Sequence, residues 1–254
     1  MSIARAWAGL LDLVYPPHCV ACGRMGAWLC AACLEAYPAF RPPWCARCGR
    51  PLPRAGVCRA CRGRSSSLRA ARSVGPHVAP LRDAVHALKY EGVRALATPL
   101  AALMAATCSL APLPVAAVVP VPLHPRRVRQ RGYNQAALLA RELARLLVLP
   151  LHEEWLERER NTPSQVGLTR AERWANVDGA FRVAAAASDA GALAGQSVLL
   201  VDDVFTSGAT LRAAAGALRS AGAEAVWAVT LTRARVGADG WAAGWAAGSA
   251  PDAP

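Results

Sequence analysis

The chain has 254 residues, enough for one domain of ordinary size and a second, small one. Its 29 basic residues outnumber 17 acidic ones, and the formal net charge of +12 favours polyphosphate or nucleic-acid ligands. Asp12 interrupts the apolar start, and prolines divide the uncharged residues 95–123 into pieces too short to cross a membrane. We therefore expect a cytoplasmic protein without a membrane span.

The first part of the chain carries eight cysteines in four Cys-x-x-Cys pairs. Each pair can present two sulfurs to one metal ion, and a tetrahedral zinc ion takes two pairs. Because few large aliphatic residues occur here, metal has to stabilise this fold. The pairs can combine sequentially or interleaved. We predict a module with two structural Zn²⁺ ions over residues 10–66, with the ligands Cys19, Cys22, Cys30, Cys33, Cys45, Cys48, Cys58 and Cys61.

Aromatic residues lie among the arginines of this module. Trp28, Tyr37, Phe40 and Trp44 either stack on nucleic-acid bases or fill a small core, and the core is the simpler interpretation. The ninth cysteine, Cys108, lies in an apolar stretch and is predicted to be a core residue.

An amphipathic helix is predicted over residues 81–90, where apolar residues have helical spacing. Lys89, the single lysine among the 29 basic residues, comes at its end. In a chain that otherwise uses arginine, this lysine suggests a compact ammonium group near a polyphosphate ligand. Chance explains its presence equally well.

A buried strand is predicted over residues 116–122, followed by a basic loop over residues 123–135. The loop holds four arginines within six positions, and a helix opens at Asn134. Guanidinium groups grip oxyanions with two N–H groups, so the loop suits a tri- or tetra-anionic ligand. A solvated basic loop is the alternative.

Residues 198–201 predict a second strand, buried on both faces, which ends at Asp202 and Asp203. Small and hydroxyl residues follow, and a helical run over residues 211–218 comes next. Backbone N–H groups at a helix start, together with hydroxyls, form a phosphate cradle. Carboxylates beside a phosphate site suit a ribose 5-phosphate, which carries hydroxyls next to its phosphate. The predicted cradle consists of Thr206, Ser207, Gly208, Ala209 and Thr210.

This stretch is similar to the signature of type I phosphoribosyltransferases. In that family two acidic residues hold the ribose 2′- and 3′-hydroxyls, and the next loop wraps the 5′-phosphate. The resemblance implies an α/β type I phosphoribosyltransferase fold, an open, mostly parallel sheet flanked by helices, over residues 67–236. Residues 237–254 lack a buriable pattern and are expected to form a disordered tail. Thr206 stands where purine-salvage relatives have a third acidic residue, which disfavours hypoxanthine and guanine as acceptors.

The resemblance extends to the ComF family. Its motifs occur here in order: residues 120–122, residues 131–135, residues 160–165 with Arg173, and the Asp-Asp loop. The family implies binding of phosphoribosyl pyrophosphate with Mg²⁺ and, in several members, a part in DNA uptake. It also implies a mobile loop over residues 158–181, in which Arg160, Gln165 and Arg173 face the pyrophosphate or the acceptor. From the basic loop and the single lysine, the predicted pyrophosphate ligands are Arg126, Arg127, Arg129, Arg131, Gly132, Asn134, Gln135 and Lys89.

Two functions therefore stay open. One is a transferase in which Asp202 and Asp203 hold the ribose during phosphoribosyl transfer to an unidentified acceptor. The other is a protein that binds single-stranded DNA and acts with other DNA-uptake proteins. It uses the phosphoribosyl site as a sensor or as a second contact.

Overall fold

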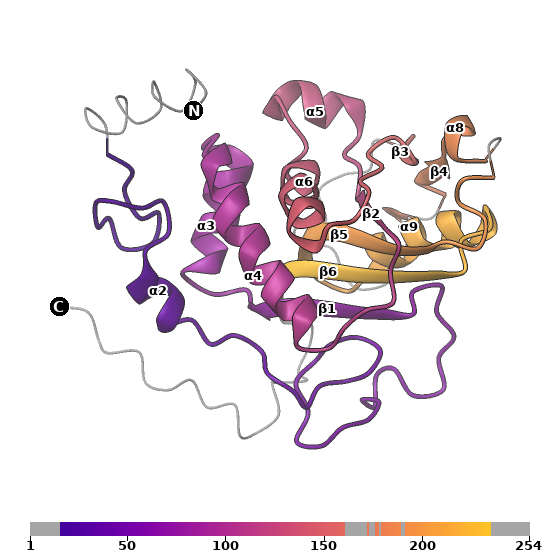
Figure 1. Cartoon of the computed structure of the whole chain (residues 1–254), viewed down its shortest axis with the longest axis horizontal. Helices are drawn as coiled ribbons and strands as arrows, with labels where there is room; N and C mark the ends of the chain where they lie inside the picture. Colours follow the sequence, from indigo (N-terminus) through magenta and orange to yellow (C-terminus); the bar gives the residue numbers. More distant parts are fainter. Residues whose placement is uncertain (1–15, 161–171, 173–175, 178, 189–190, 235–254) are drawn as a thin grey trace.

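The fold centres on a four-stranded parallel sheet with the order β1-β6-β5-β2 (Figure 1). The computed structural model describes residues 16–160, 172, 176–177, 179–188 and 191–234. Crossovers between parallel strands need helices that cover both faces. The strands of this sheet are β1 (Ala70–Pro76), β2 (Ala117–Pro120), β5 (Ser197–Phe205) and β6 (Ala225–Arg233).

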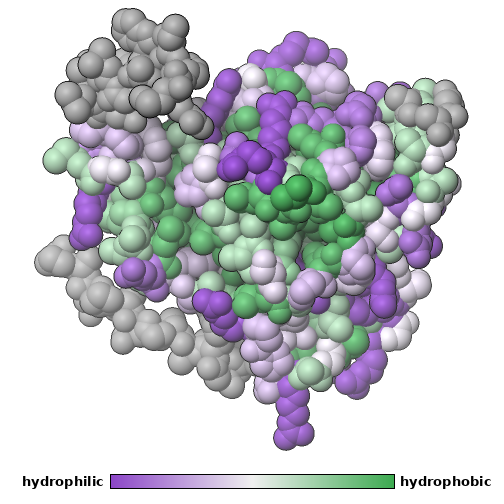
Figure 2. Space-filling model, viewed as in Figure 1, coloured by the Kyte–Doolittle hydropathy of each residue, from purple (hydrophilic) through white to green (hydrophobic). Residues whose placement is uncertain are grey.

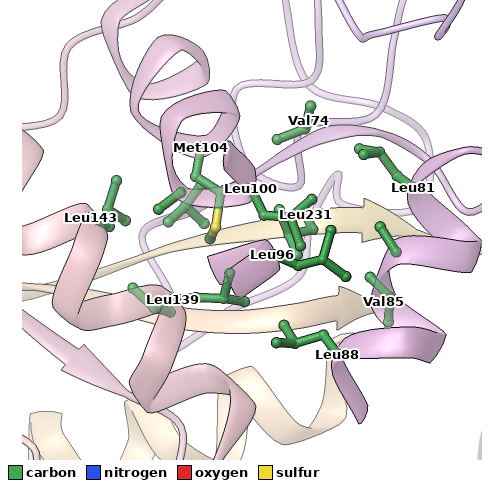
Figure 3. Close-up of a cluster of buried hydrophobic side chains, with 14 of the residues drawn as sticks. Val74, Leu81, Val85, Leu88, Leu96, Leu100, Met104, Leu139, Leu143 and Leu231 are labelled. Carbon is green, nitrogen blue, oxygen red and sulfur yellow. The ribbon is translucent and has the colours of Figure 1, made fainter. Parts of the chain in front are cut away.

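Helices cover both faces of the sheet and bury two apolar cores. Leu199 and Val201 of β5 join the core formed with α3, α4 and α6, whereas Val198 and Leu200 join the core under α9. Figure 3 shows the larger core, where leucines of α3, α4 and α6 point toward one another above the sheet. The helices are α2 (Ala31–Glu35), α3 (Leu81–Tyr90), η1 (Arg94–Leu96), α4 (Ala97–Ser109), α5 (Pro125–Arg131), α6 (Gln135–Leu147), α8 (Ala185–Ser188) and α9 (Ala209–Ser220).

Two predicted elements need correction. Strand β5 does not end at the carboxylates but continues to Phe205, because β6 continues beside it and pairs Asp202 with Thr230. The expected basic loop is largely helix α5. His124 caps this helix by accepting the N–H of Arg126, and Gly132 ends it in the left-handed conformation.

The edge strand β1 was not predicted, because the polar residues Arg72 and Ser73 interrupt the apolar run by which a buried strand is recognised. All seven of its residues are buried. The Ser73 hydroxyl lies 2.8 Å from the Thr230 hydroxyl, and the Arg72 guanidinium packs over the ring of Trp44. Polar residues thus occupy a fully buried strand because each finds a partner.

A small antiparallel pair stands beside the sheet at the ends of the expected mobile loop. It consists of β3 (Leu156–Arg158) and β4 (Phe181–Val183). Most of the loop between them, including Gln165 and Arg173, lies outside the described residues, as do the predicted tail and the short apolar segment before residue 16.

The cysteine-rich module lies along the free edge of β1 (Figure 1). Phe40 donates its N–H to the Val74 carbonyl, and Ala71 donates to the Arg47 carbonyl, both at 2.8 Å. The Tyr37 hydroxyl donates to the Pro76 carbonyl at 2.6 Å. The module therefore covers a sheet edge that would otherwise expose unpaired backbone groups.

The surface is mainly polar around α5, whose residues are all at least partly exposed, and more apolar in the middle of the face in Figure 2. Within the part of the chain that the structure describes, no helix combines the length and the apolar character needed to cross a membrane.

Candidate functional site

A cleft of about 620 Å³ opens at the carboxyl edge of the sheet. The ends of β2 and β5, which are hydrogen-bonded neighbours, both contribute to it, as expected for open α/β sheets. Helices α3 and α5 and the end of β3 form its walls. The charged and titratable residues that line it are His77, Arg82, His86, Lys89, Tyr90, Arg127, Arg131, Arg158, Asp202 and Asp203. Cations outnumber carboxylates, so the cleft suits a polyanion.

Asp203 is held by the single lysine of the chain. The Lys89 Nζ lies 2.5 Å from the Asp203 Oδ2, and both side chains are largely buried. Burial disfavours the ammonium, but the attraction of Asp203 and a hydrogen bond to it outweigh this effect and raise the pKa of Lys89. Lys89 therefore stays charged beside the carboxylate pair.

Asp202 faces a different environment from Asp203. Its Oδ1 accepts the backbone N–H of Asp203 at 2.8 Å. Although its surface is partly open to the cleft, it lies deep among protein atoms, and desolvation together with the charge of Asp203 raises its pKa to about 8. Asp202 therefore binds a proton more readily than an ordinary aspartate does.

The loop over residues 206–210 joins β5 to α9 at the cleft. Gly208 has φ +78°, and a Cβ there would lie 2.7 Å from the Phe205 ring, so a larger residue would not fit. Ser207 accepts the N–H of Ala209 at 3.3 Å, and Thr206 and Thr210 line the cleft. We call residues 206–210 the phosphate loop after the role predicted from the sequence, because the start of a helix leaves backbone N–H groups without helical partners.

Helix α5 separates the four arginines that the sequence grouped together. Arg127 and Arg131 are four residues apart, share one face and line the cleft. Arg126 and Arg129 are exposed and are not among the lining residues. A helix, unlike the expected loop, cannot turn all four toward one ligand.

The residues that follow α5 have structural partners. Asn134 caps α6 by accepting the N–H of Ala136, and its side-chain amide donates to the Val121 carbonyl. Gln135 is buried at the cleft and accepts a hydrogen bond from Arg131. Gly132 is the left-handed residue that turns the chain between the two helices. Only Gln135 of these three lines the cleft.

Five charged or titratable residues that line the cleft were not predicted from the sequence as site residues. Arg82, His86 and Tyr90 follow one another at intervals of four, so the polar face of the predicted helix was a usable signal. His77 and Arg158 gave none, since each stands at the end of a strand that was not predicted. Burial of His77, with Lys89 nearby, lowers its pKa, and its Nδ1 lies 2.8 Å from the Thr232 hydroxyl. The remaining expected loop residue, Arg160, is exposed and is not among the lining residues.

The eight cysteines of the ribbon module form two groups in sequential order. Within each group all four sulfurs lie within 4.8 Å of one another. The first cluster is Cys19, Cys22, Cys30 and Cys33, and the second cluster is Cys45, Cys48, Cys58 and Cys61. The interleaved pairing is therefore excluded.

The spacing of the sulfurs fits zinc. The Sγ atoms of Cys22 and Cys30 lie 3.7 Å apart, and those of Cys48 and Cys58 lie 3.8 Å apart. A tetrahedron with Zn–S bonds of about 2.3 Å has edges of about 3.8 Å. The N–H groups of Cys48 and Cys58 also point at the Cys45 sulfur, as expected for a thiolate. The geometry supports two structural zinc sites.

Three of the four aromatic residues in this module are core residues. Tyr37, Phe40 and Trp44 are buried, so they cannot stack on bases, whereas Trp28 is exposed. Cys108 is buried as predicted, and burial raises its pKa to about 12.

Comparison with known domains agrees with the fold and the two clusters. Residues 10–62 match the family of double zinc ribbon domains, and residues 133–249 match the family of phosphoribosyl transferase domains. The protein is thus a phosphoribosyltransferase-like protein with an amino-terminal double zinc ribbon.

Relatives define the family more narrowly. The chain is 32% identical over 213 residues to Competence protein F of Haemophilus influenzae, covering 81% of this chain and 90% of that protein. It is 32% identical over 212 residues to DNA utilization protein YhgH of Salmonella typhi, with coverage of 81% and 90%. It is 30% identical over 213 residues to Competence protein ComFC of Bacillus subtilis, with coverage of 81% and 84%. The chain belongs to the ComF family.

Proposed function

We propose that the cleft binds phosphoribosyl pyrophosphate with Mg²⁺ and that the protein transfers the phosphoribosyl group to an acceptor. The observation that carries this proposal is the meeting of three features in one cleft. These features are the Asp202–Asp203 pair, the phosphate loop and the arginine face of α5. A ligand with a diol, a phosphate and a pyrophosphate matches all three.

The carboxylate pair and the phosphate loop suit the ribose 5-phosphate half of the ligand. Carboxyl oxygens accept hydrogen bonds from vicinal hydroxyls, and the Lys89 ammonium pairs with Asp203. The 5′-phosphate fits the N–H groups and hydroxyls of residues 206–210. Because Gly208 alone allows the turn, the backbone can approach the phosphate closely.

Arg127 and Arg131 suit the pyrophosphate half. As the bond from C1 to pyrophosphate breaks, charge builds on the departing oxygens, and two guanidinium groups on one helix face stabilise it. Positive charge develops at C1, which a nearby carboxylate favours. The oxygen-rich carboxylate pair fits a hard cation, and Mg²⁺, when bound, neutralises the charge of the pyrophosphate.

Calorimetric titration of phosphoribosyl pyrophosphate with Mg²⁺ tests this proposal. We expect micromolar affinity in the zinc-loaded protein and loss of binding in an Asp202→Asn, Asp203→Asn variant. Glu142→Gln on α6, whose partner is Arg145, is the matched control for loss of a carboxylate and should bind normally. Absence of binding by the unmodified protein would refute the proposal, and pyrophosphate release with a screened acceptor would establish transfer.

A second function is favoured by the arginines that turn away from the cleft. Arg126 and Arg129 face solvent in a chain of net charge +12, and relatives bear the names competence protein and DNA utilization protein. Single-stranded DNA binding on this surface predicts an affinity that falls steeply with salt, because phosphate contacts release counterions. Fluorescence anisotropy with a labelled oligonucleotide at several salt concentrations checks this. An Arg126→Gln, Arg129→Gln variant with an unchanged salt slope would exclude this face.

A further inference from the structure

One buried arginine links the second zinc cluster to the phosphate loop. Arg233, the last residue of β6, is 8% exposed. Its Nη1 donates to the carbonyl of Cys48 at 2.6 Å, and its guanidinium carbon lies 4.2 Å from the centre of the Phe205 ring. One side chain therefore contacts a cluster residue on one side and the last residue of β5 on the other.

Phe205 in turn supports the turn of the phosphate loop. Its ring lies so close to Gly208 that a Cβ there would come within 2.7 Å of it. Gly208 holds the left-handed conformation from which α9 starts. A shift of the Phe205 ring would therefore remove the surface against which the loop turns.

The positive charge of the buried Arg233 has to be compensated by the second cluster. Among the described residues no carboxylate forms a salt bridge with it, and a buried guanidinium without compensation is costly. A zinc ion with four thiolates carries a net double negative charge, which supplies that compensation. Arg72 is also buried, and it donates to the carbonyl of Ala46, the residue after the cluster residue Cys45.

The two clusters differ in their surroundings. Cys19 and Cys30 of the first cluster belong to the apolar core that α3, α4 and α6 form. The cysteines of the second cluster form a group of their own, beside Arg72 and Arg233. The chain thus contains its own control for the effect of losing a zinc site.

We propose that Arg233 is a positioning residue for the phosphate loop, and that the second zinc ribbon, rather than the first, holds it in place. Opening the second cluster leaves Arg233 as an uncompensated buried charge, releases Phe205 and loosens residues 206–210. Ligand affinity at the cleft then depends on this zinc site. The statement about affinity rests on the proposed function, whereas the statement about the loop does not.

Hydrogen exchange of the ligand-free protein tests the role of Arg233. We expect Arg233→Met to speed amide exchange in residues 205–211 by about tenfold, while zinc content stays unchanged. Arg233→Lys, which keeps a cation and a donor, should restore most of the protection. Leu143→Ala, a core variant in α6, controls for general destabilisation. Exchange that is equal in Arg233→Met and Leu143→Ala at matched melting temperature would overturn the proposal.

A pair of cysteine variants tests the role of the second cluster. Cys58→Ser, Cys61→Ser opens this cluster, and Cys22→Ser, Cys33→Ser opens the first one. Each should lose one zinc ion by metal analysis, but only the former should speed exchange in residues 205–211. Equal effects of the two variants would overturn the proposal. If opening the second cluster prevents folding, the Arg233 variants, which leave both clusters intact, decide the question.

Titration of phosphoribosyl pyrophosphate with Mg²⁺ then measures the effect on the ligand. We expect about tenfold weaker binding by Arg233→Met, partly recovered in Arg233→Lys. Weaker binding without faster exchange would overturn the positioning role. If the unmodified protein does not bind this ligand, the proposed function fails, while the exchange results still decide the link between zinc and loop.

Discussion

Among single residues, Lys89 and Asp203 form the ion pair on which the cleft depends most directly. Their separation is 2.5 Å, and removing one partner leaves the other as a buried, uncompensated charge. We expect Lys89→Met to lower the free energy of unfolding by roughly 3 kcal/mol, measured by urea denaturation. The double variant with Asp203→Asn should lose less than the sum of the single variants, because both act on one interaction. Additive losses would show that the two groups do not depend on each other.

Asp202 gives the protein a pH dependence of a definite sign. Burial and the charge of Asp203 raise its pKa from 3.8 to about 8. The native state therefore holds this proton where the unfolded state has released it. The resulting stability is full below about pH 4 and is lost as the pH rises through about 8. Between about pH 6 and pH 9, we expect urea unfolding to show a larger fall in stability for the unmodified protein than for Asp202→Asn. Parallel curves would contradict the raised pKa. Lys89, whose pKa is also raised, stays charged over this range.

Among the elements, the phosphate loop and α9 contain two glycines whose replacement by alanine should change the stability of the protein in opposite directions. Gly208→Ala places a Cβ against Phe205 at φ +78° and should cost roughly 2 kcal/mol of stability, together with ligand affinity. Gly216→Ala, inside α9, meets nothing nearer than the Ser67 hydroxyl at 3.9 Å and should stabilise by about 0.5–1 kcal/mol. Thermal unfolding of both variants checks the contrast. A tolerated Gly208→Ala would mean that the loop does not need the left-handed turn.

In helix α5, we expect only the arginines that face the cleft to affect ligand binding. If the cleft binds pyrophosphate, Arg127→Gln and Arg131→Gln should each weaken binding by about tenfold or more, since each removes a charge-assisted hydrogen bond. Arg126→Gln and Arg129→Gln carry the same charge change on the outward faces and should leave affinity nearly unchanged. Calorimetric titrations of the four variants compare the faces. Equal losses in all four would indicate a diffuse effect of net charge instead.

The sequence predicted those elements whose pattern agrees with their final environment. The helix over residues 81–90 was found because its apolar face is regular, and the cores of β2 and β5 because apolar residues run together. Strand β1 was missed because its burial depends on partners that are distant in sequence, such as Thr230 and Trp44. The composition of residues 123–135 suggested a loop. The structure has a helix there instead, which His124 caps at its start and Gly132 ends.

The residues of the candidate site also fall into two groups: those that a sequence motif identified and those that only the fold brings together. Asp202, Asp203 and the phosphate loop are contiguous in sequence, so a motif identified them. The Lys89–Asp203 pair joins α3 to β5, and only the fold brings these two elements together. Arg158 and His77 reach the cleft from strand ends that the sequence did not predict. Local motifs therefore specify the residues proposed to bind ribose and phosphate, and tertiary structure supplies much of the rest.

Across the whole molecule, the double zinc ribbon completes the edge of the sheet. Tyr37 donates to Pro76 of β1 from a buried position, and a Cβ on Gly75 would strike its ring. Backbone hydrogen bonds of Phe40 and Ala71 continue the same contact. Because the ribbons also compensate Arg233, which packs on β5, the two parts are expected to stabilise each other rather than to behave as independent domains.

This mutual support predicts that zinc release and loss of the sheet occur in one transition. In urea, zinc release followed with a chromogenic chelator and far-ultraviolet circular dichroism should give the same midpoint. Tyr37→Phe removes one of the two donors to the buried Pro76 carbonyl, which also accepts the N–H of Val78, and should lower both midpoints together, by about 1 kcal/mol in stability. Ser109→Ala, which removes an exposed hydroxyl bonded within α4, is the control and should move neither. Zinc release at distinctly lower urea, with the circular dichroism midpoint unchanged by Tyr37→Phe, would show that the sheet is stable without the ribbons covering its edge.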